Sequence, residues 1–134
     1  MPPSKRFIQL LKEMEELHAR KNAGYAGDSP DPFLNFRQAE MIGVSAFKGC
    51  LIRISDKFSR VCSLSKNPSN DKVGEAITDT LMDMAVYSLI AICLYEEQNQ
   101  KKEKINEGVI HTKKTDIENS DEHLKTEVFW GGGE

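Results

Sequence analysis

The chain has 134 residues, which is the size of one ordinary domain. Hydrophobic residues make up 39% and charged residues 29% of it, a balance that is typical of a globular protein and excludes a fibrous or wholly disordered chain. The net charge of -3 and the pI near 5.7 argue against direct binding of duplex nucleic acid, so any bound anion must meet a local basic cluster.

The cysteines and the N-terminus indicate the cellular compartment. Cys50, Cys62 and Cys93 are widely spaced within apolar segments, which predicts buried free thiols in a reducing cytosol rather than a disulfide framework. The N-terminal residues are not followed by a long apolar stretch, so the sequence does not predict a signal peptide. The most apolar run, residues 85–95, is shorter than the roughly 20 residues of a membrane-spanning helix. We therefore expect a cytoplasmic protein with no membrane partner.

The first predicted helix covers residues 4–22, with Ser4 as its N-cap. Its apolar residues recur at spacings of three and four and form one face: Phe7, Leu10, Leu11, Met14 and Leu17. Glycines and prolines then predict a loop over residues 24–32. A short helix follows over residues 33–41 and is stopped by Gly43.

Ser45 is the predicted N-cap of a third helix, which ends before a turn at residues 67–70. Its apolar seam consists of Phe47, Leu51, Ile54, Phe58 and Val61. Charged residues at positions i, i+3, i+4 and i+7 form a mainly basic stripe on one flank: Arg53, Asp56, Lys57 and Arg60.

The fourth and longest predicted helix covers residues 71–98. Its expected inner face consists of Val73, Ile77, Leu81, Met84, Ser88 and Ile92. After Glu97 the composition becomes polar, which predicts a helical domain over residues 1–98 and a flexible, disordered tail over residues 99–134. Four helices with short connections favour an all-α four-helix bundle.

Three acidic residues of the fourth helix, Glu75, Asp79 and Asp83, lie at positions i, i+4 and i+8. Successive members are displaced by only about 40° around the helix, so they form a stripe beside the apolar face. Stacked like charges are unfavourable unless cations neutralise them. Carboxylates without His or Cys suit Mg²⁺, with Mn²⁺ as the alternative, and argue against zinc. The sequence therefore predicts a metal site at Glu75, Asp79 and Asp83.

Two further groups of residues favour a nucleotide at this stripe, although the acids could instead face water or pair with the basic stripe. Arg53, Lys57 and Arg60 on the neighbouring helix are suited to phosphate oxygens. The segment after the first helix adds a set suited to a phosphate and a base: Lys21, Asn22, Tyr25 and Asn35.

Together these segments resemble a known family. The residues that carry the resemblance are 17–25, Asn35 with Phe36, 53–60 and 75–87, in that order. They are similar to the nucleotide modification associated domain found largely in phages and bacteria, a branch of the MazG-like, all-α nucleoside triphosphate pyrophosphohydrolases. The resemblance covers residues 5–97 and leaves out the tail.

The resemblance implies a MazG-like bundle that assembles as a homodimer or homotetramer, in the host cytoplasm if the chain is phage-encoded. It implies magnesium-dependent cleavage of a nucleoside triphosphate, expected to be a deoxynucleoside triphosphate, to monophosphate and pyrophosphate. Nucleotide-pool control or DNA-base modification is the expected role. Family members hold metal with an ExxE pair on one helix and an ExxD pair on the next.

This chain departs from that pattern. Its acids are spaced by four, and its third helix offers only Asp56, while an ExxE pair, Glu13 and Glu16, lies on the first helix. On the enzyme hypothesis, Glu75 and Asp79 bind the metal, and Asp83 or Asp56 is a third ligand or the base that accepts the proton of water. The phosphates are bound by Lys21, Arg53, Lys57 and Arg60. The alternatives are a nucleotide-binding module without catalysis and a structural bundle.

Overall fold

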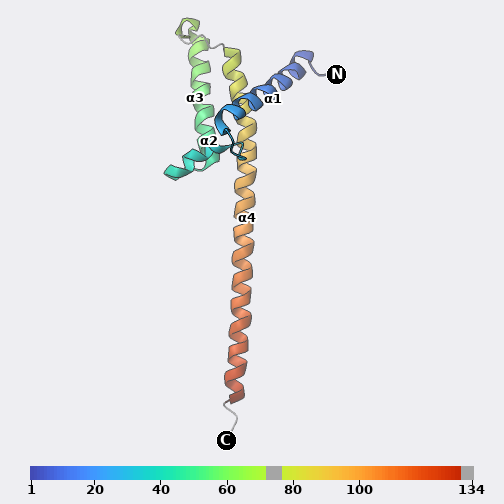
Figure 1. Cartoon of the computed structure of the whole chain (residues 1–134), viewed down its shortest axis with the longest axis vertical. Helices are drawn as coiled ribbons and strands as arrows, with labels where there is room; N and C mark the ends of the chain where they lie inside the picture. The colour runs from blue at the N-terminus through green and yellow to red at the C-terminus, as the bar shows by residue number, and fades with distance from the viewer. Residues whose placement is uncertain (72–76, 131–134) are drawn as a thin grey trace. The chain divides into compact units, whose positions relative to one another are not determined.

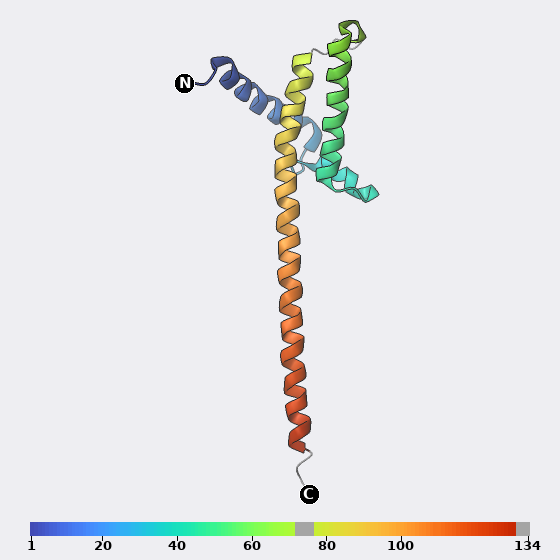
Figure 2. The same cartoon turned by 180° about the vertical axis from the view of Figure 1, so that it is seen from behind.

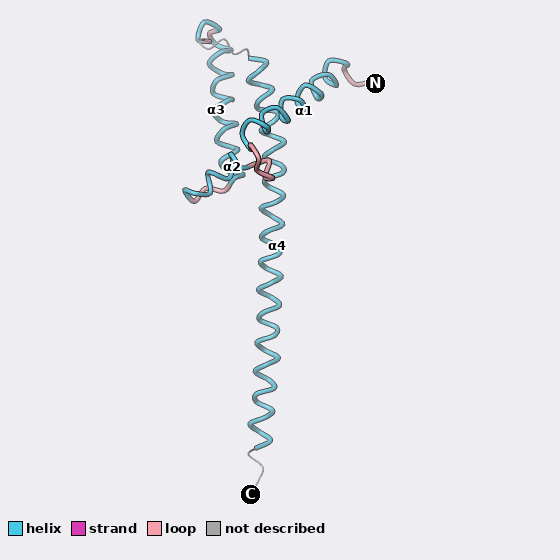
Figure 3. The backbone as a smooth tube through the Cα atoms, viewed as in Figure 1, coloured by secondary structure: helices cyan, strands magenta, loops and turns pink. Residues whose placement is uncertain are grey.

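The computed structural model describes residues 1–71 and 77–130, and in this part of the chain it contains helices and no strands (Figure 3). The predicted all-α class is therefore confirmed for the described residues. The chain divides into two compact units, Met1–Tyr95 and Glu96–Glu134. The elements, in chain order, are α1 (Lys5–Ala26), α2 (Leu34–Arg37), η1 (Gln38–Ile42), α3 (Ala46–Lys66), η2 (Pro68–Asn70) and α4 (Ile77–Trp130) (Figure 1).

Side-chain caps fix the starts of α1 and α3 where the sequence predicts them. The hydroxyl of Ser4 accepts a hydrogen bond from the Phe7 amide at 3.4 Å, and that of Ser45 accepts one from the Lys48 amide at 3.2 Å. Each bond satisfies an amide that has no partner within the first helical turn. The predicted end of α1 at residue 22 is too early. The helix continues to Ala26 and ends at Gly27, whose φ of 52° favours glycine.

The core of the first unit joins α2, α3 and α4. Its buried residues are Phe36, Ala46, Cys50, Val86, Ile90, Ala91 and Leu94, and Met14 and Leu17 of α1 pack against them. The Phe36 and Tyr87 rings form a T-shaped pair at a centroid distance of 5.8 Å. In both views α3 runs beside the first turns of α4 (Figure 2).

The buried faces of α3 and α4 differ from the predicted ones. On α3 the buried residues are Ala46, Cys50 and Leu64, whereas Leu51 and Phe58 of the predicted seam are exposed. On α4 the buried residues are Thr80, Asp83, Val86, Ile90, Ala91 and Leu94. Phe47 and Ile54 of the predicted α3 seam do pack against the core, so that prediction is partly confirmed. On α4, Val73 lies outside the described residues, and Leu81, Ser88 and Ile92 are exposed. The apolar pattern gave the wrong face of α4 because it excludes a charged residue from the core, although ion pairs compensate burial of Asp83.

The thiols also correct one prediction. Cys50 is buried and Cys62 is half-buried, but Cys93 is exposed. Cys93 lies on α4 between Ile92, which is 54% exposed, and the buried Leu94, so it belongs to the outward face of the helix. The sulfur of Cys50 lies 3.2 Å from the backbone carbonyl of Tyr87 and connects α3 to α4.

The fourth helix continues far beyond its predicted end at residue 98, because α4 includes residues up to Trp130. The extra segment is rich in Lys and Glu and contains no proline, a composition that favours helix. Thr112 and Thr115 donate hydrogen bonds to the carbonyls of Gly108 and His111, one turn earlier. The prediction of a polar segment after residue 98 did not anticipate this helix.

By length and composition alone, α4 passes the test for a membrane-spanning helix. A window of 18 residues within Ile77–Glu118 has a mean hydropathy of 1.6, and 33% of that window is buried. Val86, Ile90 and Leu94 of this stretch lie in the core of the first unit. Packing within that unit therefore accounts for part of the apolar character of α4.

Candidate functional site

Asp83 of α4 is a buried carboxylate, with a residue exposure of 7%. The ammonium nitrogen of Lys21, on α1, lies 2.5 Å from its Oδ1 atom. The ammonium nitrogen of Lys57, on α3, lies 2.9 Å from its Oδ2 atom. Asp83 therefore ties three helices together through both of its oxygens.

Burial and the two lysines act on the pKa of Asp83 in opposite directions. Burial is the largest single influence and raises the pKa, because it disfavours the charged carboxylate. The hydrogen bonds from Lys21 and Lys57, together with their positive charges, outweigh it. The pKa of Asp83 is therefore below its ordinary value, and the carboxylate is ionised at neutral pH.

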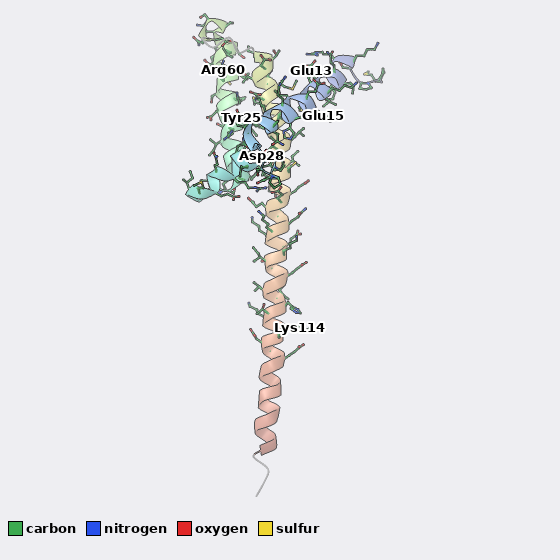
Figure 4. The ribbon with its side chains drawn as sticks, viewed as in Figure 1. Glu13, Glu15, Tyr25, Asp28, Arg60 and Lys114 are labelled. Carbon is green, nitrogen blue, oxygen red and sulfur yellow. The ribbon has the colours of Figure 1, made fainter. Side chains whose placement is uncertain are left out.

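An open pocket of about 520 Å³ lies between α1 and α4. Its acidic lining residues are Glu13 and Glu16 from α1 and Asp79 and Asp83 from α4. Its basic lining residues are Arg6, Arg20 and Lys21. Glu13, visible on α1 in Figure 4, pairs with Arg6 at 2.8 Å on the exposed side. The ExxE pair of α1 thus shares one pocket with the acids of α4.

A second, much smaller pocket of about 30 Å³ lies next to the first, and Lys21 lines both. The other polar and aromatic residues that line it include Asn22, Tyr25, Asn35 and Tyr87. Tyr25 lies near the C-terminal end of α1 and is 65% exposed (Figure 4). The structure therefore brings together the predicted set of Lys21, Asn22, Tyr25 and Asn35.

The predicted phosphate-binding residues of α3 do not line either pocket: Arg53, Lys57 and Arg60. The guanidinium of Arg53 lies 4.9 Å from the centre of the Phe36 ring, and its Nη2 atom donates to the carbonyl of Asn35 at 3.5 Å. Arg60, labelled on α3 in Figure 4, pairs with Asp71 at 3.1 Å. Lys57 is engaged by Asp83, and the two residues that Arg53 contacts, Asn35 and Phe36, line the smaller pocket.

The structure describes two of the three predicted metal ligands, Asp79 and Asp83. Glu75 lies outside the described residues, Asp79 is exposed and lines the acidic pocket, and Asp83 is engaged by lysines. Within residues 1–71 and 77–130, no three Asp, Glu, His or Cys side chains converge as a metal site. Asp56, the other predicted third ligand or base, is exposed on α3 and lines neither pocket.

The donor set nevertheless fits a hard cation. Glu16 and Asp79 offer carboxylate oxygens from two helices to one pocket, and the side chains that line it include no cysteine or histidine. Mg²⁺ keeps several waters and needs only one or two carboxylates in addition to phosphate oxygens. The oxygen donors of this pocket therefore suit Mg²⁺ or Mn²⁺ better than zinc.

Sequence reasoning missed two features of the site. It did not pair the ExxE motif of α1 with the acids of α4, because the crossing of two helices is not encoded in local spacing. It also placed Asp83 beside the apolar face rather than within the core. A usable signal was present, since Thr80, Asp83, Val86 and Ile90 follow the spacing of three and four that defines a helix face.

No protein-family model matches the chain, and neither the curated proteins nor the solved structures include a significant match. The resemblance to the nucleotide modification associated domain therefore remains a prediction from the motifs.

Proposed function

We propose that the first unit is a metal-dependent nucleoside triphosphate pyrophosphohydrolase of the nucleotide modification associated family, built as a MazG-like helical bundle. The expected substrate is a deoxynucleoside triphosphate, and the expected role is nucleotide-pool control or DNA-base modification. The observation that carries the proposal is the acidic pocket between α1 and α4, which adjoins a pocket lined by aromatic and amide side chains through the shared residue Lys21.

The acidic pocket offers ligands for the metal. Asp79 with Glu16 would hold Mg²⁺ or Mn²⁺, and Glu75 remains a ligand proposed from the sequence. A bound divalent ion supplies charge neutralisation of the triphosphate and lowers the pKa of a coordinated water. Glu16 of α1 and Asp79 of α4 would bind the ion from two sides of the pocket.

The chemistry to be catalysed is attack of a water oxygen on the α-phosphorus of the triphosphate. The bond between that phosphorus and the α–β bridging oxygen breaks, and the bridging oxygen leaves with pyrophosphate. One proton of the attacking water must go to a base. Because Asp83 is engaged by two lysines, Asp56 lies outside the pocket and Glu16 is the proposed metal ligand, we assign this role to Glu13, the other acid of the ExxE pair.

The smaller pocket suits the nucleoside. The ring of Tyr25 is exposed and offers a face on which a base can stack. The amides of Asn22 and Asn35 carry both donors and acceptors, as recognition of a base edge requires. The pocket is narrow, so the base would lie in its open mouth.

Exposed apolar side chains support the proposed assembly as a homodimer or homotetramer. The proposed compartment is the cytoplasm. Two further open pockets flank the crossing of α1 and α4, with volumes of about 370 and about 300 Å³. Their lining includes large residues that are 41–57% exposed, namely Phe7, Leu11, Leu81 and Leu89. A second copy that covered these residues would bury apolar surface.

A screen of the common nucleoside and deoxynucleoside triphosphates with Mg²⁺ or Mn²⁺ tests the proposal, with pyrophosphate measured separately from phosphate. Asp79→Asn and Glu16→Gln should each lower kcat by about a hundredfold, the scale of losing a proton acceptor or charge-stabilising group. Glu15→Gln is the matched control, since Glu15 is an exposed acid of α1 outside the acidic pocket. Wild-type pyrophosphate release by both pocket variants would refute the assignment.

A nucleotide-binding module without catalysis is the second candidate. The observation that favours it is the lack of three converging metal-ligand side chains among the described residues. A nucleotide present at 100 times its dissociation constant would then stabilise the fold by about 2.7 kcal/mol. Thermal stabilisation by nucleotides with no pyrophosphate release under any metal would identify this function.

A further inference from the structure

Apolar side chains are exposed along the helix of the second unit. The described residues of this unit, 96–130, form one continuous part of α4. Every residue from 100 to 118 is exposed, and these include Ile105 at 65%, Val109 at 49% and Ile110 at 67%. β-branched residues lose side-chain freedom in a helix, so helix propensity does not explain their presence. Because most helical stability in proteins comes from packing of an apolar face, these residues indicate a surface that a partner covers.

Charge divides the same segment into two halves of opposite sign. The basic half, residues 98–114, contains five lysines and two glutamates, a net charge of +3 with histidine neutral. Lys114, labelled in Figure 4, is its last residue. The acidic half, residues 115–130, contains five acids and one lysine, a net charge of -4. The helix dipole favours cations near the C-terminal end, yet the last turn of α4 contains no basic residue. Stabilisation of a single helix therefore does not account for this order of charges.

We propose that the helix of the second unit pairs with the same helix of a second copy of this chain, in the antiparallel direction. A parallel pair would place like charges side by side. An antiparallel pair places the basic half of each copy against the acidic half of the other, because two-fold symmetry repeats every contact. The paired residues line neither candidate pocket, so the pair does not depend on the enzyme assignment.

A seven-residue repeat sets the register of the pair. Ile110, Ile117 and Leu124 are spaced by seven, a period that keeps apolar residues in the seam of two helices that coil around each other. When position 117 of each copy meets the other at the two-fold axis, position 110 lies level with position 124. Positions 113 and 114, both lysine, then lie level with positions 121 and 120. The same register therefore matches apolar with apolar residues and lysines with the acidic half.

The two kinds of contact have different effects. Exposed ion pairs contribute little to affinity, so burial of the apolar repeat would hold the pair together. The charges would select the antiparallel direction, as the flanking charges of coiled coils select orientation.

Two charge-reversal variants of the full chain test the pair. The basic-half variant carries Lys113→Glu and Lys114→Glu, and the acidic-half variant carries Asp121→Lys and Glu122→Lys. Each variant places like charges against each other at both ends of the seam, so its self-association should weaken by about tenfold or more. An equimolar mixture should regain wild-type affinity, because each altered half then meets its opposite charge. Sedimentation equilibrium measures the dissociation constant of each association step.

The control variant, Lys48→Glu with Lys66→Glu, makes the same change of charge at exposed lysines of α3 and should associate like the wild type. Association through the first unit is common to all these chains, so it cannot produce recovery on mixing. The loss in each variant should also shrink in 1 M salt, where the screening length is about 3 Å.

Zero-length cross-linking of the wild type identifies the direction of the pair. A mixture of ¹⁴N- and ¹⁵N-labelled full chains is linked with a carbodiimide, and links that join the two isotopes report contacts between copies. Such links should join Lys113 or Lys114 to Asp121 or Glu122. Mixed links from these lysines to Asp116 or Glu118 alone would indicate a parallel pair and overturn the proposal. Wild-type dissociation constants in both charge variants, or no recovery on mixing, would overturn it as well, including where this helix binds a different protein.

Discussion

Single side chains of the first unit show how burial changes their chemistry. Cys50 of α3 is fully buried, and desolvation raises the pKa of its thiol to about 11, although the charge of Arg53 acts in the opposite direction. Its thiol is therefore protonated and unreactive at neutral pH. Asp83 is also buried but stays ionised, because two lysines face it. The difference lies in the partners of each group rather than in burial itself.

The depressed pKa of Asp83 predicts an acid-sensitive contribution to stability. Its folded pKa is below the ordinary value of 3.8, so the unfolded state binds this proton more readily. The contribution is complete above the ordinary pKa and is lost as the pH falls through the folded value. Urea unfolding of the wild type should therefore show a decreasing free energy of unfolding on acidification below about pH 5.

Asp83→Asn should be less stable at neutral pH and should lose less stability over the same acid range. Asp56→Asn, which removes an exposed carboxylate of α3, is the matched control and should follow the wild-type profile. Identical acid profiles for the wild type and Asp83→Asn would show that the two lysines do not stabilise the carboxylate in solution.

At the scale of helices, the contact between α3 and η1 depends on Gly49, because glycine has no Cβ atom. A Cβ atom added to Gly49 would lie 2.9 Å from the Cβ atom of Ala39 and 3.6 Å from the carbonyl oxygen of Phe36. Both neighbours belong to the segment that leads from the nucleoside pocket into α3. Close approach of this segment therefore requires glycine, although alanine is the better helix former.

Gly49→Ala should destabilise the first unit by about 1–3 kcal/mol, the usual cost of forcing extra volume into a packed contact. Gly24→Ala is the control, because an added Cβ there meets no atom within 4 Å. It should be neutral or stabilise α1 by up to about 1 kcal/mol. Equilibrium unfolding in denaturant measures both changes, and equal stability of the two variants would contradict the close contact.

The elements also show what local sequence can predict. The starts of α1 and α3 follow from Ser4 and Ser45, because a capping hydroxyl acts on amides within its own turn. The length of α4 beyond residue 98 was missed, since polar composition was taken as a sign of disorder rather than of helix. Helix ends depend on the next few residues, whereas buried faces depend on which helix lies opposite.

At the scale of the whole molecule, the described core and the candidate pockets lie in the first of the two units. The buried apolar residues and both candidate pockets described above belong to Met1–Tyr95. Lys21, Lys57 and Asp83 were each predicted for the site, but their meeting point was not, because α1, α3 and α4 are far apart in the sequence. Tertiary packing alone makes this cluster, which local spacing cannot encode.

A chain that ends after residue 98 should fold and keep its nucleotide binding, because it retains the complete core of the first unit. Its thermal midpoint and nucleotide affinity should match those of the full chain. A chain that ends after Met84 is the contrasting control, since it lacks Val86, Ile90 and Leu94 and should not fold. Loss of cooperative unfolding in the longer fragment would show that the second unit stabilises the first.

The bond between Lys21 and Asp83 joins positions that are 62 residues apart in the chain. Closure of a loop of this length is entropically costly, so such a contact forms only after the intervening helices have collapsed. During synthesis, α1 leaves the ribosome long before its acceptor has been translated. This ion-pair cluster of three helices therefore cannot form until translation has passed codon 83.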